Sequence, residues 1–273
     1  MTISLEDKTV ILTGATEGIG KATAFLLAKD KPNLLLVTRN KKKTEKTIEN
    51  IKKKTKITNL DYFLVDFSSL DQVKNFTDRF KEKYDHLDIL INNAGMVSVR
   101  RKTTKDGLEL TFTVNYLAPF LLTNLLLDKI KKSVPARIIN VASAAHYGQK
   151  IDFNDIQMEK KYNVWTAYSR SKLGNIMFTY SLANKLIGSG VTVNCLHPGT
   201  VRSSLPRVPI VKWLWKYNPF FISTKKSARY IYFLVTSEEL NEVTGKYFDK
   251  KIIRKSSRYS CLIEEQEHLW ELS

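Results

Sequence analysis

The sequence predicts an α/β fold, in which a mostly parallel seven-stranded sheet carries helices on both faces in a doubly wound arrangement. Two observations lead to this prediction. Short apolar runs alternate with amphipathic helical patterns along the chain, which is typical of parallel sheets. A glycine-rich turn joins the first strand to the first helix, where folds of this class bind ligands. The 273 residues contain no internal repeat, linker or low-complexity segment, so we expect one domain over 1–273.

The predicted strands are short apolar runs, and the predicted helices lie between them. The strands are expected at 9–13, 33–38, 60–65, 87–91, 137–141, 191–196 and 246–248. Apolar residues recur three and four positions apart in the predicted helices at 20–29, 70–84, 108–131, 166–186 and 225–235. One more helix follows the second strand, with Thr44, Ile48 and Ile51 on one face and lysines on the other.

The chain is strongly basic, with a formal net charge of +17 and a pI near 9.7. Its lysines cluster at 41–43, 52–54 and 56. These clusters fit a solvated helix face, and they also fit a field that attracts an anionic cofactor or an acidic membrane surface. No basic run is interleaved with aromatic residues as a nucleic-acid platform requires, so we expect no nucleic-acid partner.

Cysteine and histidine positions predict neither disulfides nor a metal site. Cys195 and Cys261 lie far apart without metal-ligand spacing, which is typical of free thiols in a reducing intracellular compartment. His146, His197 and His268 share no ligand spacing either, so we expect no bound metal. The strand pattern begins near the first residues and we find no apolar run of transmembrane length, so we expect a cytoplasmic or peripheral membrane protein without a signal peptide or anchor.

The first strand runs into a glycine-rich turn at 13–20 that opens the first helix. Gly14, Gly18 and Gly20 let the backbone turn tightly and approach a pyrophosphate, whose charge then faces the N-terminal end of the helix. The spacing differs from the common G-x-G-x-x-G, and a simple strand-to-helix turn is the alternative. The position of the loop between the first strand and first helix favours a dinucleotide site.

Residues at the ends of the second and third strands indicate which dinucleotide binds. Thr38 and Arg39 end the second strand, where a 2′-phosphate favours arginine and free ribose hydroxyls favour an acidic residue. We therefore expect NADP(H), with NAD(H) less favoured; an ordinary surface arginine is the alternative. Asp66 follows the third strand and is expected to accept a hydrogen bond from the adenine amino group, or else to cap a helix before Leu70.

Polar residues also follow the central strands. The small residues at 92–95 would let the chain pass beneath the adenine ribose, although this stretch also fits a plain turn. Asn115 lies within an apolar helix four residues before Pro119, and a local kink with water on exposed carbonyls would explain both. Ser143 ends the fifth strand, so its hydroxyl is expected at the cleft.

Tyr168 and Lys172 lie four positions apart in a predicted helix, so their side chains project from the same face. A neighbouring cation favours the phenolate, so we expect the Lys172 ammonium to lower the pKa of the Tyr168 phenol from about 10. A tyrosine tuned in this way exchanges a proton with a substrate oxygen near neutral pH. The alternative is a solvated surface pair, which this spacing alone does not exclude.

Taken together, these stretches resemble the short-chain dehydrogenase/reductase family over nearly the whole chain. The family's TGxxxGIG loop matches 13–20, its NNAG motif 92–95, its YxxxK motif 168–172 and its PG motif 198–199. The resemblance implies a Rossmann-type fold. It also implies an oxidoreductase that interconverts an alcohol and a carbonyl by hydride transfer with a nicotinamide cofactor. A cofactor-binding regulatory or scaffold protein with little turnover is the rival reading.

The resemblance assigns roles to four candidate catalytic residues: Asn115, Ser143, Tyr168 and Lys172. Tyr168 would give its proton to the carbonyl oxygen, Ser143 would hold that oxygen, Lys172 would bind the nicotinamide ribose, and Asn115 would keep a water in the proton relay. The implied cofactor contacts are Gly14, Thr16, Glu17, Gly18, Ile19, Gly20, Arg39, Asn40, Asp66, Phe67, Asn93, Ala94, Gly95, Tyr168, Lys172, Pro198, Gly199 and Val201.

Four further stretches, at 168–175, 191–202, 245–249 and 269–272, resemble the retinol dehydrogenase-like branch. This implies a retinoid, a lipid aldehyde or a related apolar substrate, and a homodimer through the two long central helices. The chain departs from that branch at Glu17, where many NADP-binding members carry a basic or neutral residue, and in starting without a hydrophobic anchor.

Substrate specificity is expected from the segment 203–224, which is rich in aromatic and aliphatic residues with interposed lysines. Trp213, Trp215 and Phe220 would form an apolar lid over a lipid-like carbonyl, or a helix at a membrane interface. Core packing by a short helix is the alternative. Tyr147 and Trp165 are further candidates for the pocket border, unless they are ordinary core residues.

Overall fold

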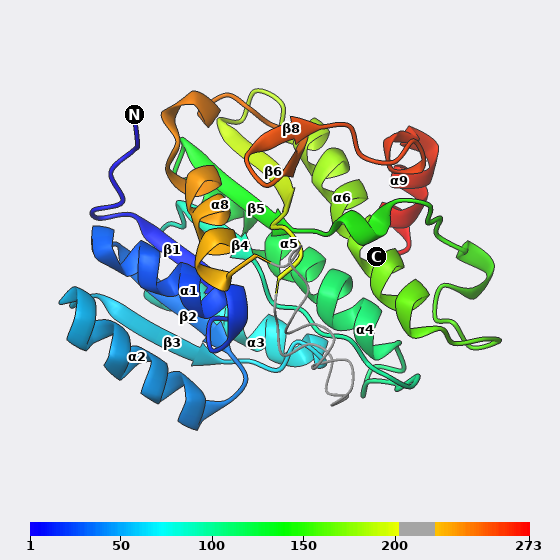
Figure 1. The fold of residues 1–273 in the computed structure, drawn as a ribbon, viewed down its shortest axis with the longest axis horizontal. Helices are drawn as coiled ribbons and strands as arrows, with labels where there is room; N and C mark the ends of the chain where they lie inside the picture. Colours follow the sequence, from blue (N-terminus) through cyan, green and yellow to red (C-terminus); the bar gives the residue numbers. More distant parts are fainter. Residues whose placement is uncertain (202–221) are drawn as a thin grey trace.

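A computed structural model describes residues 1–201 and 222–273 and has one twisted sheet between two helical layers (Figure 1). Eight strands lie in the order β3-β2-β1-β4-β5-β6-β7-β8. The first seven pair in parallel, and β8 runs antiparallel to β7. The α/β, doubly wound fold predicted from the sequence is therefore confirmed.

The seven predicted strands are present with small shifts at their ends. They are β1 (Thr9–Thr13), β2 (Asn33–Thr38), β3 (Leu60–Leu64), β4 (Ile89–Asn92), β5 (Ala136–Val141), β6 (Val191–His197) and β7 (Lys246–Asp249). The expected strand count of seven is wrong, because β8 (Ile252–Arg254) adds an eighth at the edge. Its three residues are all exposed, so β8 lacks the buried apolar run by which the other strands were found.

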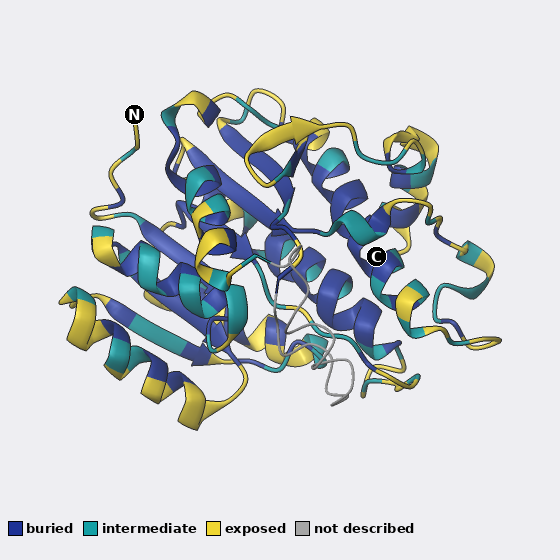
Figure 2. Ribbon diagram, viewed as in Figure 1, coloured by how far each residue is buried: buried dark blue, intermediate teal, exposed yellow. Residues whose placement is uncertain are grey.

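The predicted helices are present with shifted ends, and α9 is a further helix that the sequence analysis did not predict. They are α1 (Gly18–Leu27), α2 (Lys41–Thr55), α3 (Leu70–Lys83), α4 (Leu110–Phe112), α5 (Ala118–Lys131), α6 (Val164–Lys185), α8 (Thr224–Thr236) and α9 (Ile263–Glu271), with short helical turns η1 (Ala28–Asp30), η3 (Ala144–His146), η4 (Phe153–Asp155), η5 (Glu238–Leu240) and η6 (Tyr259–Cys261). The lysine face of α2 is exposed to solvent, as Figure 2 shows, while Thr44 and Ile51 are buried beneath it.

Two apolar layers hold the helices to the sheet. Ile11 of β1 faces a core shared with α3, α5, α6 and α9, whereas Val10 and Leu12 face a core shared with α1, α2 and α8. This alternation follows from the two-residue period of a strand. Because both faces are covered, the inner strands are buried along their whole length, as parallel sheets require.

The predicted helix at 108–131 contains a wider turn. Between α4 and α5 the chain forms a π-helical segment, η2 (Thr113–Leu117), in which the Ala118 N–H donates to the Thr113 carbonyl five residues back. Among the described residues, Leu110–Lys131 is long and apolar enough to cross a membrane, so the expectation that no run reaches that length is wrong. The stretch is apolar because most of it is buried in the core.

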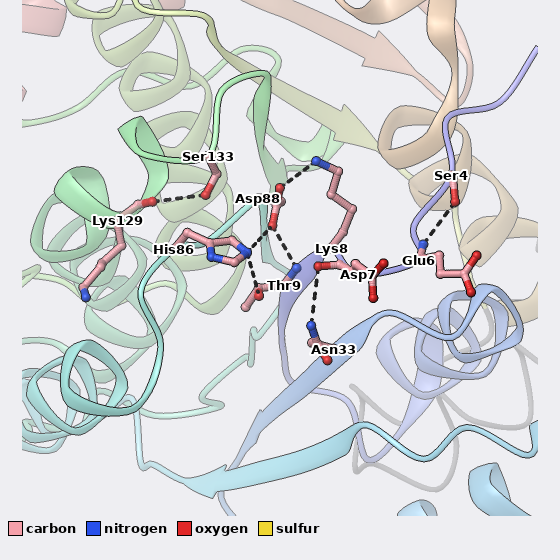
Figure 3. A network of polar contacts seen from close by, with 10 residues as sticks. All are labelled: Ser4, Glu6, Asp7, Lys8, Thr9, Asn33, His86, Asp88, Lys129 and Ser133. Carbon is pink, nitrogen blue, oxygen red and sulfur yellow. Dashed lines mark hydrogen bonds and ion pairs between the residues drawn. The ribbon is translucent and has the colours of Figure 1, made fainter.

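A network of polar contacts joins β1 to β4 at the amino ends of the strands (Figure 3). The buried carboxylate of Asp88 accepts hydrogen bonds from Lys8 Nζ and from the Thr9 backbone N–H, both at 2.9 Å. His86 Nε2 lies 3.4 Å from the same carboxylate. These contacts hold β1 and β4 together at their amino ends. The predicted site lies at the other end of the strands, beyond their carboxyl ends.

Arg137 on β5 fastens α8 to the sheet. Its guanidinium group is buried, with the residue 6% exposed, and donates to the carbonyls of Leu234, Val235 and Ser237 at 2.7–2.9 Å and to Asn241 Oδ1 at 2.6 Å. The last carbonyls of a helix have no partner within the helix and carry partial negative charge, so a cation there is stabilising. Burial lowers the pKa of Arg137.

Arg137→Met is expected to lower the free energy of unfolding by roughly 2–4 kcal/mol, because it leaves several buried carbonyls without a donor. Denaturant unfolding measures this change. The matched control is Arg229→Met, since Arg229 is exposed on the same helix and such a change should shift stability by less than about 0.5 kcal/mol. Equal losses in the two variants would contradict the capping role of Arg137.

Candidate active site

The predicted cofactor residues gather where the strand order reverses. The chain proceeds outward from β1 through β2 to β3 in one direction and from β4 onward in the other, so β1 and β4 are neighbours at the centre. The glycine-rich loop follows β1, and the stretch Asn92–Gly95 begins at the end of β4. Open α/β sheets bind ligands at such a crevice, beyond the carboxyl ends of the strands.

Close packing explains two glycines of the loop. Gly14 has φ +71°, and a Cβ on it would lie 2.8 Å from the Ala94 Cα. A Cβ on Gly20 would lie 2.2 Å from the Gly14 carbonyl oxygen. Both distances are shorter than non-bonded atoms tolerate, so only glycine fits this backbone. The loop is thereby pressed against the stretch that follows β4.

Thr13 and Asn93 hold these two stretches together. The Thr13 hydroxyl oxygen accepts from the backbone N–H groups of Asn93 and Ala94, both at 2.9 Å. Asn93 Nδ2 donates to the carbonyls of Thr13 at 2.8 Å and Gly14 at 3.3 Å. Asn93 therefore has a clear structural role in shaping the glycine loop, beside the cofactor contact predicted for it.

The first turn of α1 is suited to an anion. Gly18 has φ +54°, and a Cβ on it would meet no atom within 4 Å. In the described part of the chain no side chain caps this turn, and it contains no acidic residue. Its N–H groups and the positive end of the helix dipole are available to a phosphate. Glu17, at the N-cap position, forms an ion pair with Lys43 of α2.

Residues after β2 and β3 form the far end of this crevice. The Arg39 guanidinium lies 3.8 Å from the Asp66 carboxylate, which brings the two predicted adenosine contacts together. Asn40 caps α2 by accepting from the Lys43 N–H. The helix α3 is capped by Ser69, so the alternative role of Asp66 as its cap is wrong. Phe67 is buried in the core, so any contact with a cofactor would come from its backbone.

Ser143 and Tyr168 meet at the end of β5. Ser143 follows β5, and its Oγ accepts from the Ala145 N–H at 3.2 Å, which leaves the hydroxyl proton free to donate. The Tyr168 phenol, on α6, lies close enough to the Ser143 hydroxyl for that hydroxyl to lower the pKa of the phenol, against the larger effect of burial. Ser143 and Tyr168 are 25 positions apart in the sequence, and the fold brings them together from the end of β5 and from α6.

The expectation that Lys172 lowers the pKa of Tyr168 is wrong. Burial raises the pKa of the Tyr168 phenol, and the opposing effect comes from the Ser143 hydroxyl rather than from Lys172. Lys172 Nζ lies 5.8 Å from the Tyr168 ring centroid and donates instead to the Val141 carbonyl at 2.8 Å. Lys172 is itself buried, which lowers its pKa to about 8. The phenol therefore keeps its proton at neutral pH.

Asn115 lies in η2 and links the stretch after β4 to α6. Its Oδ1 accepts from the Met96 N–H at 2.8 Å, and its Nδ2 donates to the Met96 carbonyl at 2.9 Å and to Ser171 Oγ at 3.0 Å. Pro119 has no N–H, so the Asn115 carbonyl has no backbone donor four residues later. The kink predicted from this proline takes the form of a π-helical turn.

The stretch after β6 closes the crevice on the side of α8. Gly199 has φ +85°, and a Cβ on it would lie 2.4 Å from Ile222 Cδ1. The Pro198 carbonyl accepts from the Ser227 hydroxyl of α8 at 2.7 Å, and Val201 forms a bridge with Ile222. Contacts with Ile222, just before α8, and with Ser227 of α8 thus hold all three predicted cofactor contacts of this stretch.

Most of the predicted substrate lid lies outside the described residues. This applies to 203–221, with Trp213, Trp215 and Phe220. Of the other candidates for the pocket border, Trp165 and Tyr147 are both largely exposed, and the Trp165 ring centroid lies 6.3 Å from that of Tyr168. Neither residue is therefore an ordinary core residue.

A cavity of about 450 Å³ lies elsewhere, at the open edge of β3. It is lined mainly by charged and aromatic side chains, namely Asp61, Tyr62, Phe63, Arg79, Glu82 and Lys83. None of the predicted site residues lines it, and two of its four charged residues, Asp61 and Lys83, form an ion pair with each other. We therefore place the candidate active site at the carboxyl ends of the strands.

The sequence predicts neither a role for His146 at this site nor the partner of Tyr147. His146 and Tyr147, directly after the Ser143 loop, contact the segment 255–257, which follows β8. These partners are more than 100 positions apart, so no local pattern announces them.

Comparisons with known proteins agree with this geometry. The model of the family described as short chain dehydrogenase matches residues 8–208. The chain belongs to the short-chain dehydrogenase family. Human retinol dehydrogenase 13 is 42% identical over 260 residues, covering 90% of this chain and 77% of that protein. Retinol dehydrogenase 12 of Mus musculus is 39% identical over 274 residues, covering 99% and 86%.

A solved structure of a family member supports the fold. A short chain dehydrogenase from Burkholderia cenocepacia J2315, in complex with NADP, superposes with a TM-score of 0.72 at 23% identity, covering 90% of this chain and 97% of that one. The protein is thus an oxidoreductase of the short-chain dehydrogenase family acting on CH–OH groups, similar to retinol dehydrogenases. Its family uses nicotinamide cofactors.

Proposed function

We propose that this protein is an NADP(H)-dependent enzyme that interconverts an alcohol and a carbonyl on an apolar substrate. The observation that carries the proposal is the closeness of the Ser143 hydroxyl to the Tyr168 phenol beyond the carboxyl end of β5, with Lys172 bonded to Val141 at the end of that strand and Asn115 bonded to Ser171 of α6. An acid and a second hydrogen-bonding group directed at one position are what a carbonyl oxygen needs when it accepts hydride and a proton.

The residues of the crevice fit a dinucleotide. The glycine loop and the uncapped first turn of α1 would hold the pyrophosphate, while Asp66 and Arg39 would take the adenosine end. The stretches Asn93–Gly95 and Pro198–Val201 would border the middle and the nicotinamide end. When bound, the cofactor supplies the hydride, and the protein supplies orientation, proton transfer and exclusion of water.

Each catalytic side chain has a role that its surroundings support. Tyr168 keeps its proton at neutral pH because burial raises the pKa of its phenol, so it is suited to donate to a carbonyl oxygen. Ser143 holds the same oxygen by a second hydrogen bond. Lys172 does not lower the pKa of the phenol and donates instead to the Val141 carbonyl. Its ammonium is suited to bind the nicotinamide ribose. The Asn115 carbonyl, which cannot receive a hydrogen bond from Pro119, is suited to hold a water that returns protons.

The charges around α2 favour NADP(H) over NAD(H). Lys41, Lys42 and Lys43 form the first turn of α2, which contains no acidic residue. Cations are unfavourable at a helix N-terminus, because the helix dipole is positive there. A 2′-phosphate beside Arg39, which follows β2 and lies two residues before this turn, would compensate this repulsion. The electrostatics of this turn thus support a phosphorylated cofactor.

Arg39→Asp is expected to weaken NADPH binding by about 10- to 100-fold, because a charge-assisted hydrogen bond contributes roughly 1.5–3 kcal/mol. The NADH affinity should stay equal or improve. Fluorescence titration of both cofactors measures the change. Lys53→Asp, which makes the same charge change at the exposed far end of α2, is the control. If both variants lose NADPH affinity equally, net charge rather than Arg39 selects the phosphate.

The substrate class follows from the relatives rather than from a described pocket. The retinol dehydrogenases that match this chain act, by their names, on retinol, and we propose a retinoid, a lipid aldehyde or a related apolar compound here. We also propose a peripheral contact with membranes, from which such substrates would be drawn, and a reducing intracellular location.

A spectrophotometric screen tests the proposed function. NADPH or NADH is mixed with the protein and retinal, medium-chain aldehydes, steroid ketones or quinones, and absorbance at the nicotinamide band is followed. Oxidation of NADPH with an apolar carbonyl, faster than that of NADH, supports the proposal. Tight NADPH binding without turnover of any of these carbonyls would instead favour a cofactor-binding regulatory or scaffold protein.

A further inference from the structure

His146 is fully buried, with 0% of its surface exposed, directly after the loop that carries Ser143. Its Nδ1 lies 2.7 Å from the Ser143 carbonyl oxygen, and its Nε2 lies 3.1 Å from the Ser257 backbone nitrogen. A carbonyl only accepts and a backbone N–H only donates, so these contacts fix the tautomer. Nδ1 carries the proton and donates to Ser143, and Nε2 accepts from Ser257.

The segment 255–257, called here the C-terminal strap, has two more contacts with the site. The Tyr147 hydroxyl donates to the Lys255 carbonyl at 2.7 Å. The Tyr180 hydroxyl lies 2.7 Å from Ser256 Oγ. Since Tyr180 belongs to α6, which also carries Tyr168, the strap joins the loop of one candidate catalytic residue to the helix of another.

The hydroxyl and the carbonyl of Ser143 both accept hydrogen bonds from the residues that follow it. Its Oγ accepts from the Ala145 N–H, and its carbonyl accepts from His146. The position of the hydroxyl depends on this backbone, and a misplacement of about 1 Å at a reacting centre costs on the order of 10²-fold in rate. The rings of Tyr147 and Tyr247 pack against the imidazole, with centroids 4.0 and 5.0 Å from it, and keep it in place.

We propose that His146 is a positioning residue, which ties the Ser143 loop to the C-terminal strap and so holds the Ser143 hydroxyl where it meets the substrate oxygen. This inference rests on the role proposed for Ser143. His146 does not act as an acid or base itself, because both of its ring nitrogens are engaged. Burial also lowers the pKa of His146, which keeps the ring neutral.

Two substitutions separate the two hydrogen bonds. His146→Asn places an amide near the position of Nδ1 and retains a donor for the Ser143 carbonyl. His146→Gln places its amide near the position of Nε2 and loses that donor. Both remove the same ring from between Tyr147 and Tyr247, so each is the packing control for the other.

We expect His146→Gln to lower kcat by about 10- to 100-fold with KM and NADPH affinity nearly unchanged. His146→Asn should keep a kcat several-fold above that of His146→Gln. The measurements are steady-state kinetics with the best carbonyl from the screen and fluorescence titration of NADPH. Equal kcat values in the two variants, or losses confined to KM and NADPH affinity, would overturn the inference.

Hydrogen exchange gives a readout that does not need turnover. The His146 and Tyr147 amides donate to the Ser143 and Ala144 carbonyls, and His146→Gln should speed their exchange more than His146→Asn does. If neither variant folds, Tyr147→Phe, which frees the strap at Lys255, should give the same faster exchange and a reduced kcat. Unchanged exchange and kcat in that variant would overturn the inference. A wild-type protein without turnover would contradict the proposed function alone, because the exchange comparison still decides the role of His146.

Discussion

Tyr168→Phe is expected to lower kcat by about 10²- to 10⁴-fold, the range that general acid catalysis contributes. The substitution removes the phenol proton and keeps the ring, so the packing of α6 should persist. NADPH affinity should stay close to that of the wild type, because the glycine loop and Arg39 are untouched. Turnover is measured with the best carbonyl from the screen, and NADPH affinity by fluorescence titration.

The control for this variant is Tyr232→Phe, which removes one tyrosine hydroxyl far from the site. That hydroxyl donates to Asp30 at 2.7 Å and joins α8 to η1. We expect Tyr232→Phe to cost some stability and leave kcat unchanged. If Tyr168→Phe turned over like the wild type, Tyr168 would not be the acid, and the proton would have to come from water or from Ser143.

Gly20→Ala is expected to lose most NADPH binding and to destabilise the protein. A Cβ at this position would lie 2.2 Å from the Gly14 carbonyl oxygen and 2.4 Å from Asn93 Nδ2, so the loop or the stretch after β4 must move. Overpacking of this kind costs roughly 1–3 kcal/mol, and the displaced loop would no longer present its N–H groups to a pyrophosphate. NADPH titration and denaturant unfolding measure the two effects.

Gly18→Ala, in the same loop, is the control for Gly20→Ala, because it adds the same methyl group without a steric clash. Its Cβ would meet no protein atom within 4 Å, and its cost comes from the left-handed backbone, at about 1 kcal/mol. Gly18→Ala should therefore be more stable than Gly20→Ala, although a methyl group facing the pyrophosphate would still weaken binding. Equal stability of the two variants would mean that the loop absorbs the Gly20 clash without strain.

The features that the sequence predicted well are local. The parallel strands could be predicted because each is a short apolar run. The glycine loop could be predicted because its residues are close together in the sequence, between the first strand and the first helix. Ser143 and Tyr168 could be brought together in the prediction because both follow from recognisable patterns at known places in an α/β sheet. In the structure the Ser143 hydroxyl lies close enough to the Tyr168 phenol to affect its pKa.

The features that were missed depend on distant partners or on surroundings. Arg137 was visible only as a strand residue, because its acceptors on α8 lie about a hundred positions later. His146 finds Ser257 in the same way. The effect of Lys172 on the pKa of Tyr168 was wrong because spacing on a helix gives a shared face, whereas the Val141 carbonyl decides where the ammonium lies and burial decides the pKa of the phenol.

The wider turn at Thr113–Leu117 has a bearing on how this backbone could change by mutation. A π-helical turn accommodates one residue more than the regular helix would, and it is less stable than the regular form. Removing one residue here would relax the helix into its more favourable geometry and rotate Asn115 away from Met96 and Ser171. Selection for stability alone would therefore favour loss of this turn. The turn keeps Asn115 in its present position at the cost of the regular helical geometry.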